Sequence, residues 1–363
     1  MARDTQAGEA MFDVIIIGLG PAGSTLARLL SGKQKVLCLD KKTDASDSFS
    51  KPCGGLLAPD AQKALARFDL TLPKSVLVDP QLFSVRTIDL ASGLCRHYPR
   101  FYINMNRHRF DRWLISLIPN SVSVQAGAQV VRAVRETDGS FSVTFRQNGS
   151  LHTARGRRLV GADGADSFVR RTFFPRHAIR SYTAVQQWFA DTHKSPFYSC
   201  IFDPAETDCY AWSVSKDGYF IFGGAYPVQN SRARFERQKK KLERLGLQFG
   251  NPLKTEACRV LRPAGWKEFC LGGNGVFLIG EAAGFISPSS LEGISSAFES
   301  ARRLADSFEQ TPGRTEHRRY ARNTLRLRLK LWSKLFKCPF MYRPLLRKWV
   351  MKSGLQSISV LRS

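Results

Sequence analysis

The chain has 363 residues, of which 43% are hydrophobic, so it can bury one large core or two connected ones. No apolar run reaches the roughly 18 residues that span a bilayer, and no cysteine spacing indicates disulfides or zinc, so we expect a cytoplasmic protein with reduced thiols. The formal net charge of +25 indicates an anionic partner, either a phosphate-rich surface such as a bilayer or a nucleic acid.

The first expected elements surround a glycine-rich turn. A buried strand over residues 14–17 runs into a G-x-G-x-x-G motif, and a helix follows over residues 24–30. The first glycine makes the turn, the second lets the backbone approach a pyrophosphate, and the third lets the helix pack against the strand. A second strand ends about 20 residues on in a carboxylate that can accept a hydrogen bond from a ribose hydroxyl. The motif predicts a dinucleotide site, the alternative being a turn without a ligand. The candidate residues are Gly18, Gly20, Gly23, Asp40 and Lys41.

The next stretch, KPCGG, puts a thiol on a tight turn. Cys53 follows a proline and precedes Gly54 and Gly55, two residues without side chains. Glycines at such a place allow a ligand to approach the backbone closely. We therefore take this turn as a candidate part of the binding site.

Residues 78–103 and 180–226 contain short alternating runs of aromatic and β-branched residues, which predict antiparallel strands with one face inward. Because these runs interrupt the nucleotide-binding segments, we infer a second, sheet-based domain over the cofactor. Its inward face is expected to line a pocket for a long apolar chain or an aromatic ring. The expected lining residues, each of which could instead belong to the core, are Trp188, Phe197, Tyr198, Tyr210, Trp212, Tyr219 and Phe222.

Two later strand–turn–helix segments complete the cofactor pattern. In residues 158–171 a strand runs into Asp163, and in residues 275–308 a strand leads to a small-residue turn and a long helix. The candidate binding residues of the second segment are Gly280, Glu281, Gly293 and Ile294. Together with the first motif, this set resembles the FAD-dependent hydroxylase superfamily. In that superfamily a late aspartate holds the ribityl chain of FAD, and this chain has Glu281 there instead.

Three further segments resemble the geranylgeranyl reductase family: KPCGG, the segment CYAWSVSKDGYFIFGG and the helix RHRFDRWL. Tyr210, Trp212 and Lys216 match the family's Y-x-W-x-F-P-K motif, whereas Val214 and Ser215 depart from it. Arg107 is the residue expected near the flavin's polar chain. The pattern, which covers about residues 12–355, is most similar to the bacterial CbrA-type members. The resemblance implies FAD and reduction of carbon–carbon double bonds in isoprenoid chains.

The same resemblance places the cysteine turn beside the isoalloxazine ring. Reduction of an alkene needs a hydride from reduced flavin at one carbon and a proton at the other, and an apolar pocket holds no water to supply it. We propose Cys53 as the proton donor or a substrate-positioning group, with Tyr210 and Trp212 in the same catalytic set. The alternative is a small packed side chain that supports the loop.

The basic C-terminus contains an amphipathic pattern. Leu325, Leu329, Trp332 and Phe336 form one helical stripe beside a basic stripe, and Pro339 is expected to end this helix. The pattern fits an interfacial anchor on anionic lipid. The alternative, which the sequence leaves equally open, is a stripe packed against the protein. No motif for binding nucleic acid is present.

The predicted fold is α/β, with a Rossmann-like FAD-binding domain of the glutathione-reductase or hydroxylase type, an interleaved antiparallel-sheet substrate domain and a helical C-terminus. The expected ranges are 12–77, 104–178 and 268–310 for the first, 78–103 and 179–267 for the second, and 311–363 for the third. The expected function is FAD-dependent reduction of an isoprenoid or polyprenyl lipid. The alternatives are a flavin-dependent monooxygenase or halogenase, and a flavin-bound protein that handles lipids or regulates without catalysis. We expect no metal and an electron donor that the sequence does not name.

Overall fold

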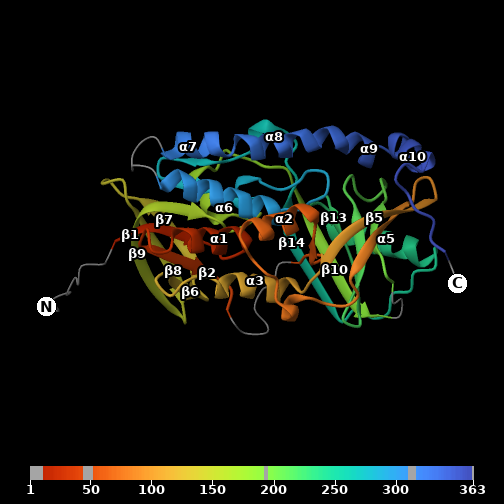
Figure 1. Cartoon of the computed structure of the whole chain (residues 1–363), viewed down its shortest axis with the longest axis horizontal. Helices are drawn as coiled ribbons and strands as arrows, with labels where there is room; N and C mark the ends of the chain where they lie inside the picture. The colour runs from red at the N-terminus through yellow and green to blue at the C-terminus, as the bar shows by residue number, and fades with distance from the viewer. Residues whose placement is uncertain (1–10, 44–51, 192–194, 310–315, 362–363) are drawn as a thin grey trace.

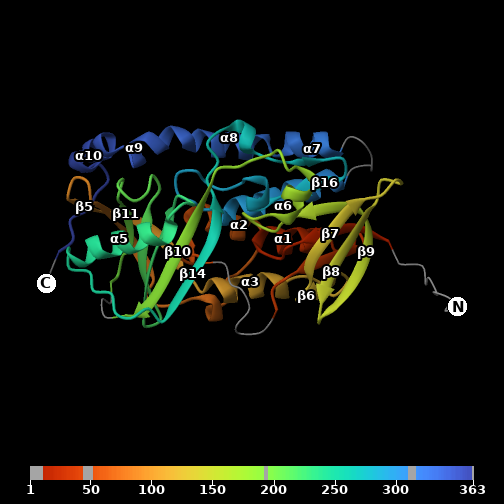
Figure 2. The ribbon, with the colours of Figure 1, turned by 180° about the vertical axis from the view of Figure 1, so that it is seen from behind.

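The computed structural model describes residues 11–43, 52–191, 195–309 and 316–361. Ser50 and Lys51, which precede the cysteine turn, and the first residues of the basic C-terminal region lie outside these ranges. Two sheets lie side by side along the long axis of the molecule, and α7–α10 run along one long edge past both (Figure 1). Figure 2 shows the same arrangement from behind.

The first sheet has β1 at its centre, between β2 and β9, and all three run parallel. Val14, Ile15 and Ile16 of β1 are fully buried, as expected for a parallel strand covered on both faces. The strand order is β15-β16-β9-β1-β2-β6, with β8 joining β9 and β7 joining β8. The bounds are β1 Phe12–Ile17, β2 Val36–Asp40, β6 Ser123–Ala126, β7 Gln129–Arg135, β8 Phe141–Gln147, β9 Ser150–Gly161, β15 Gly272–Gly273 and β16 Val276–Leu278.

The carboxyl ends of β1, β9 and β16 meet at one edge of this sheet, where the three predicted cofactor turns lie together. Helix α1 follows the first turn and packs against α6, which follows the third. The helices of this part are α1 Pro21–Leu30, α3 Arg107–Ser116, α4 Phe168–Phe173, α6 Ile294–Phe308 and α7 Glu316–Asn323, with a 3-10 turn η3 at Gly280–Ala283. Such an edge is where ligands bind in open α/β sheets.

The second sheet has the order β14-β10-β13-β12-β11-β4-β5-β3 and is antiparallel except where β4 pairs with β11. It therefore joins strands from before α3 to strands from after α4. The bounds are β3 Leu56–Leu57, β4 Leu82–Asp89, β5 Leu94–Asn104, β10 Ser181–Ala190, β11 Tyr198–Phe202, β12 Ala211–Lys216, β13 Tyr219–Tyr226 and β14 Lys254–Leu261. The other elements here are α2 Pro59–Arg67, η1 Lys74–Val76, α5 Ser231–Glu243 and η2 Trp266–Glu268.

The C-terminal stretch is nearly continuous helix: α8 Leu325–Ser333, η4 Lys334–Lys337, α9 Cys338–Tyr342 and α10 Pro344–Ser353. The expectation that Pro339 ends the first helix is wrong, because Pro339 lies in the first turn of α9. A proline is tolerated there, since the first N–H groups of a helix have no partner within it. Gly354, at φ +66°, ends α10. Within the described ranges no helix is both long and apolar enough to cross a bilayer.

Candidate functional site

One cavity of about 990 Å³ runs from the three turns of the first sheet across one face of the second sheet to α9 and α10. It contains every predicted site residue except Gly23, although these residues come from segments far apart in the sequence. The predicted residues that line it are Gly18, Gly20, Asp40, Lys41, Cys53, Gly54, Gly55, Arg107, Asp163, Tyr210, Trp212, Gly280, Glu281, Gly293 and Ile294.

The three glycines of the first motif have different surroundings. A Cβ on Gly18, which has φ +96°, would lie 2.7 Å from the carbonyl oxygen of Ala162, and one on Gly23 would lie 1.9 Å from the carbonyl oxygen of Gly18. A Cβ on Gly20 would meet no protein atom within 4 Å, although Gly20 lines the cavity. Gly18 and Gly23 therefore allow close packing of the protein itself, whereas Gly20 leaves space beside the start of α1.

Asp40 lies at the end of β2 and is 6% exposed. Its Oδ2 accepts a hydrogen bond from the backbone N–H of Leu19 at 2.6 Å, and its Oδ1 accepts one from that of Lys42 at 2.9 Å. The carboxylate thus holds the glycine turn in place. Each oxygen retains a second lone pair, so Asp40 can also accept a hydrogen bond from a ribose hydroxyl.

Asp163 has a buried carboxyl oxygen, Oδ1, without a hydrogen-bond partner. Its Oδ2 accepts from the backbone N–H of Val169, and burial raises the pKa of the carboxyl group. The neighbouring Arg170 donates to the carbonyl oxygens of Ala165 and Ala282 at 2.5 and 2.6 Å, and so ties the second turn to the third. An orphaned buried acceptor on the cavity wall fits a ligand that donates a hydrogen bond.

The third turn brings Gly280 and Glu281 to the cavity, and Gly293 and Ile294 begin α6 beside it. The resemblance implies that Glu281 holds a ribityl chain. Its Oε1 accepts a hydrogen bond from the backbone N–H of Leu261 at 3.0 Å, so one oxygen is already used to anchor β14. The N-termini of α1 and α6 both face the cavity, and together they favour an anion such as a pyrophosphate.

Arg107, at the start of α3, is held by Asp111, which accepts from its Nε at 2.8 Å and from Lys42 at 3.1 Å. Burial alone would lower the pKa of Arg107, but Asp111 and the neighbouring Cys53 raise it above its ordinary value. Burial likewise works against the charge of Asp111, whose pKa is lowered because Arg107 and Lys42 surround it. Two cations and one carboxylate leave a net positive charge on this wall.

Lys216, at the end of β12, fixes the cysteine turn through hydrogen bonds. The Lys216 ammonium donates to the carbonyl oxygens of Gly55 at 3.0 Å and Met105 at 2.8 Å, and to the side chain of Asn104. Burial lowers the pKa of Lys216 to about 7. A Cβ on Gly55, at φ +62°, would lie 2.4 Å from the Met105 oxygen, so only glycine fits this place.

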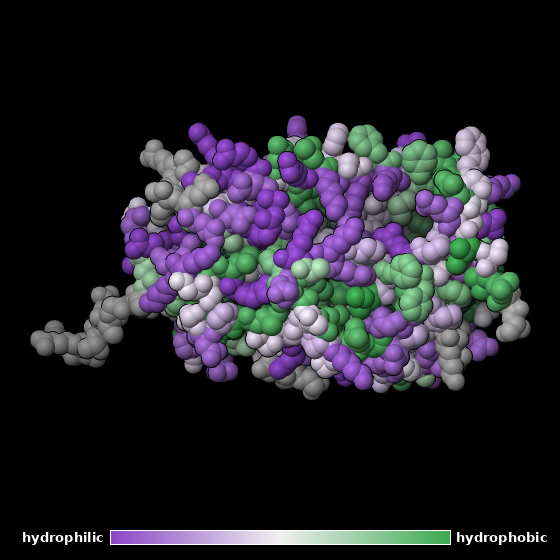
Figure 3. Space-filling view, viewed as in Figure 1, coloured by the Kyte–Doolittle hydropathy of each residue, from purple (hydrophilic) through white to green (hydrophobic). Residues whose placement is uncertain are grey.

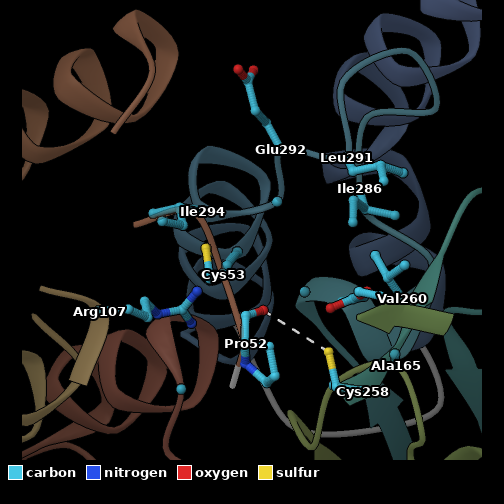
Figure 4. Close-up of a pocket in the computed structure, with 18 of the residues that line it drawn as sticks. Pro52, Cys53, Arg107, Ala165, Cys258, Val260, Ile286, Leu291, Glu292 and Ile294 are labelled. Atoms are coloured by element: carbon cyan, nitrogen blue, oxygen red, sulfur yellow. Dashed lines mark hydrogen bonds between the residues drawn. The ribbon is translucent and has the colours of Figure 1, made fainter. Parts of the chain in front are cut away.

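Cys53 belongs to the same turn. Its sulfur accepts a hydrogen bond from the N–H of Gly55, with the nitrogen and sulfur 3.4 Å apart. Its sulfur lies between Arg107 and Ile294, whereas Cys258 and Val260 belong to the opposite wall (Figure 4). The turn therefore brings a thiol close to the Arg107 guanidinium on one wall of the cavity.

Tyr210 and Trp212 line the cavity beyond the cysteine turn, and their rings lie edge to face with centroids 6.0 Å apart. The Tyr210 hydroxyl donates to the carbonyl oxygen of Ser290 at 2.6 Å, and the Trp212 N–H donates to Gln186 at 3.3 Å. Burial raises the pKa of Tyr210. The rings of both residues are therefore available to a ligand, whereas the hydroxyl of Tyr210 and the N–H of Trp212 are hydrogen-bonded to the protein. A Cβ on Gly54 would lie 3.9 Å from Trp212.

Four of the seven aromatic residues expected to line the pocket do not. Trp188 and Tyr219 contact each other, Phe197 contacts His97, and Phe222 packs against Phe235 of α5. The period of two along a strand explains Phe222, since alternate residues of β13 face α5 and the cavity layer. The expectation is correct for Tyr198, Tyr210 and Trp212.

Several polar residues that line the cavity near the second sheet and α10 were not predicted from the sequence. Glu292 accepts a hydrogen bond from the Tyr102 hydroxyl at 2.9 Å and pairs with Arg100 at 3.6 Å. Arg347 of α10 pairs with the fully buried Asp89 at 2.7 Å. No local pattern could have identified these contacts, because the paired residues are at least 190 positions apart in the sequence and Arg347 lies among other basic residues.

The residues at the turns fit FAD. Space beside Gly20, two helix N-termini, the carboxylate of Asp40, the orphaned oxygen of Asp163 and the cation Arg107 match the pyrophosphate and polar chain of a dinucleotide. In the part of the chain that the structure describes, no three His, Cys, Asp or Glu side chains come close enough to hold a metal ion.

Close relatives share this sequence over nearly its whole length. Protein CbrA of Shigella flexneri serotype 5b is 54% identical over 352 residues, which cover 97% of this chain and 96% of that protein. Protein CbrA of Escherichia coli O157:H7 is 53% identical over 352 residues, with 97% and 99% covered. No protein-family model matches the chain.

Solved structures of flavoproteins share the fold. A geranylgeranyl bacteriochlorophyll reductase-like protein from Thermoplasma acidophilum has a TM-score of 0.70 at 20% identity, covering 97% of this chain and 89% of that one. PqsL of Pseudomonas aeruginosa, in complex with 2-aminobenzoylacetate, has a TM-score of 0.71 at 17% identity, covering 94% and 100%. The flavin-dependent brominase Bmp2 has 0.68 at 18%, covering 94% and 93%. The predicted fold class is thereby confirmed.

Proposed function

The chain belongs to the CbrA family, and from this membership and its flavoprotein fold we propose that it is an FAD-dependent oxidoreductase that reduces carbon–carbon double bonds of an isoprenoid or polyprenyl lipid. The observation that carries this proposal is the position of Cys53. The thiol lies in the same cavity as the glycine turns and the apolar residues of the second sheet, and its sulfur lies beside Arg107 and Ile294 (Figure 4).

FAD would be held by the turns of the first sheet. The pyrophosphate would lie beside Gly20 and the N-termini of α1 and α6, Asp40 would accept from the ribose, and Arg107 would face the polar chain. When bound and reduced, FAD supplies the electron pair for the reduction. Gly54 leaves the cysteine turn without a side chain beside Trp212, whereas Gly55 makes room for the carbonyl oxygen of Met105.

Cys53 would supply the proton that the second carbon of the alkene needs. The guanidinium of Arg107 lies beside it, and Lys216 is held beneath the same turn. The guanidinium would stabilise the thiolate that remains after the proton leaves, and Lys216 would add to this in its protonated form. Tyr210 would not compete, because its hydroxyl already donates to Ser290 and burial keeps it neutral.

The apolar chamber would hold the isoprenoid chain. Its wall is mainly hydrophobic, which favours a substrate with little polar surface. The residues that contribute to it are Val85, Tyr98, Tyr102, Tyr198, Cys200, Phe202, Tyr210, Trp212, Met341, Val350 and Met351. Exclusion of water by such a wall also makes an internal proton donor necessary.

A flavin-dependent monooxygenase or halogenase is the second candidate. Solved structures of such enzymes share this fold at TM-scores close to that of the reductase-like protein. The same chamber would then hold an apolar or aromatic substrate. The two candidates differ in whether the product gains hydrogen or oxygen.

The purified protein, loaded with FAD and reduced with dithionite without oxygen, is incubated with polyprenyl lipids, and the products are analysed by mass spectrometry. We expect products with two added hydrogens per reduced double bond. Products that form only with oxygen and contain an added oxygen atom would instead support the monooxygenase. No product under either condition would support a lipid-handling or regulatory protein.

Replacing Cys53 with Ala tests the role of the thiol. FAD content should stay unchanged, whereas turnover should fall at least tenfold, because general acid catalysis typically contributes roughly 10²–10⁴-fold. Cys95→Ala is the matched control, since Cys95 is an exposed thiol of β5 outside this cavity. Equal turnover of the Cys53→Ala and Cys95→Ala variants would reject the catalytic role of Cys53.

A further inference from the structure

The outer face of α8–α10 exposes large apolar side chains in a row. Phe336 is 64% exposed, Leu345 74% and Trp349 71%, and Trp332 and Phe336 lie edge to face with centroids 5.2 Å apart. Green apolar side chains alternate with purple ones along the upper edge of the molecule, where these helices run (Figure 3). The other exposed apolar residues of this face are Leu325, Leu329, Phe340 and Val350. So many exposed large apolar side chains on one set of helices mark an interaction site.

This row is not needed to attach the helices to the protein. The side of the same helices that packs inward carries Leu327, Leu331 and Met351, which are between 2% and 7% exposed. Arg347 adds a buried ion pair with Asp89. The apolar stripe predicted from the sequence therefore faces outward, and the inner face is provided by different residues.

The charge around the row has one sign. The segment from 325 to 353 contains no Asp or Glu, and its basic residues are Arg326, Arg328, Lys330, Lys334, Lys337, Arg343, Arg347, Lys348 and Lys352. Outside the segment, Asp60 of α2 pairs with Lys330 and Lys334. The surroundings of the apolar row are thus strongly basic, which is complementary to an anionic surface.

The cavity opens within this face. Phe340 and Val350 line the cavity and are nevertheless 54% and 42% exposed, so they lie at its mouth. Met341 and Met351 line the cavity just inside. An apolar passage therefore connects the exposed row with the chamber beneath α9 and α10.

We infer that the outer face of α8–α10 docks on an anionic phospholipid bilayer, with Phe336, Leu345 and Trp349 inserted at the interface. An apolar lipid then enters the chamber between Phe340 and Val350 without crossing water. Basic amphipathic helices with an aromatic residue at the boundary bind membranes in this way. The docking itself requires no catalysis, and only the entry of substrate rests on the proposed function.

Sedimentation of the full chain with vesicles tests the docking. We expect the protein to partition onto vesicles of phosphatidylglycerol mixed with phosphatidylcholine at least tenfold more strongly than onto phosphatidylcholine alone, and added salt to weaken the binding. Equal binding to both vesicles, or to neither, would overturn the inference.

Two variants separate the apolar and electrostatic parts. Leu345→Gln with Trp349→Gln should lower partitioning at least tenfold, and Lys348→Glu with Lys352→Glu should abolish the preference for anionic lipid. The matched control, Leu253→Gln, changes a leucine just before β14 that is 63% exposed and should have no effect. Far-ultraviolet circular dichroism checks that each variant is folded. Unchanged partitioning of either variant would contradict the docking.

Activity on a short isoprenoid in detergent keeps this inference separate from the proposed function. A variant that binds vesicles poorly but reduces the detergent-solubilised substrate normally supports docking through this face. Wild-type protein that binds anionic vesicles but reduces no substrate supports the docking and rejects only the proposed reaction. Binding of duplex DNA that competes fully with vesicles and survives the Leu345→Gln and Trp349→Gln changes would overturn the choice of a bilayer.

Discussion

The glycines of the first motif allow a matched pair of variants that separates folding from cofactor binding. A methyl group added at Gly23 would lie 1.9 Å from the carbonyl oxygen of Gly18, whereas one added at Gly20 would meet no protein atom within 4 Å. Gly20 has φ −74° and ψ −171°, values that alanine adopts readily. The same methyl group should therefore destabilise the folded protein in Gly23→Ala and weaken the binding of FAD in Gly20→Ala.

Overpacking of a buried site costs about 1–3 kcal/mol, and a clash between backbone atoms belongs at the upper end. With an unfolding entropy of about 2.1 cal/mol/K per residue, 3 kcal/mol lowers the Tm of a chain of this length by about 4 °C. Gly23→Ala should show this shift without FAD. Gly20→Ala should keep its Tm or gain slightly, because alanine reduces the entropy of the unfolded chain.

In the Gly20→Ala variant the same 1–3 kcal/mol should appear in binding, as an FAD dissociation constant raised about 5- to 150-fold. Thermal unfolding of the apoprotein by circular dichroism measures the first effect, and titration with FAD by fluorescence quenching measures the second. Wild-type affinity for FAD in Gly20→Ala would refute the placement of the pyrophosphate. An equal loss of Tm in both apoproteins would refute the packing argument.

Three further changes test the charges of the site. Arg347→Met leaves the buried Asp89 unpaired and should lower the free energy of unfolding in urea by about 3–5 kcal/mol, most of which Arg347→Met with Asp89→Leu should restore. Because the pKa of Asp111 is lowered, its carboxylate stabilises the folded protein above pH 4. The difference in free energy of unfolding between the wild type and Asp111→Asn should therefore disappear as the pH falls below about 3.8. Lys216 has a pKa of about 7 when folded, against 10.5, so the unfolded chain binds more protons between these values. The stability of the wild type relative to Lys216→Met should therefore rise from pH 7 to 9 by roughly 1.4 kcal/mol per pH unit, and a flat difference would contradict the lowered pKa.

The cofactor half of the fold could be predicted because its signals are local. A buried run of β-branched residues, three glycines at fixed spacing and a helix follow one another within 20 residues, and the contact of Gly23 with Gly18 is the contact that this spacing requires. The later turns at Asp163 and Gly280 were predicted in the same way, from a strand that ends in small residues.

The chamber could not be predicted in the same detail. Its wall includes Arg100, Glu292 and Arg347, whose partners are distant in sequence, so neither periodicity nor spacing indicates their burial. Arg347 also lies among exposed basic residues that look alike in the sequence. The aromatic residues were misplaced for a related reason, since alternation predicts two faces of a strand but does not say which one faces a helix such as α5.

The parallel pairing of β4 with β11 has a consequence for biosynthesis. Val85 lies opposite Tyr198, so this pairing closes a loop of more than 100 residues that contains β6, β7, β8 and β9 of the other sheet. Contacts at such a separation form late and slowly. The ribosome must therefore release residues beyond Phe202 before β4, which already pairs with β5, gains its second neighbour β11. We expect that neither half of the molecule folds when produced alone, and that truncated chains aggregate through the open strand.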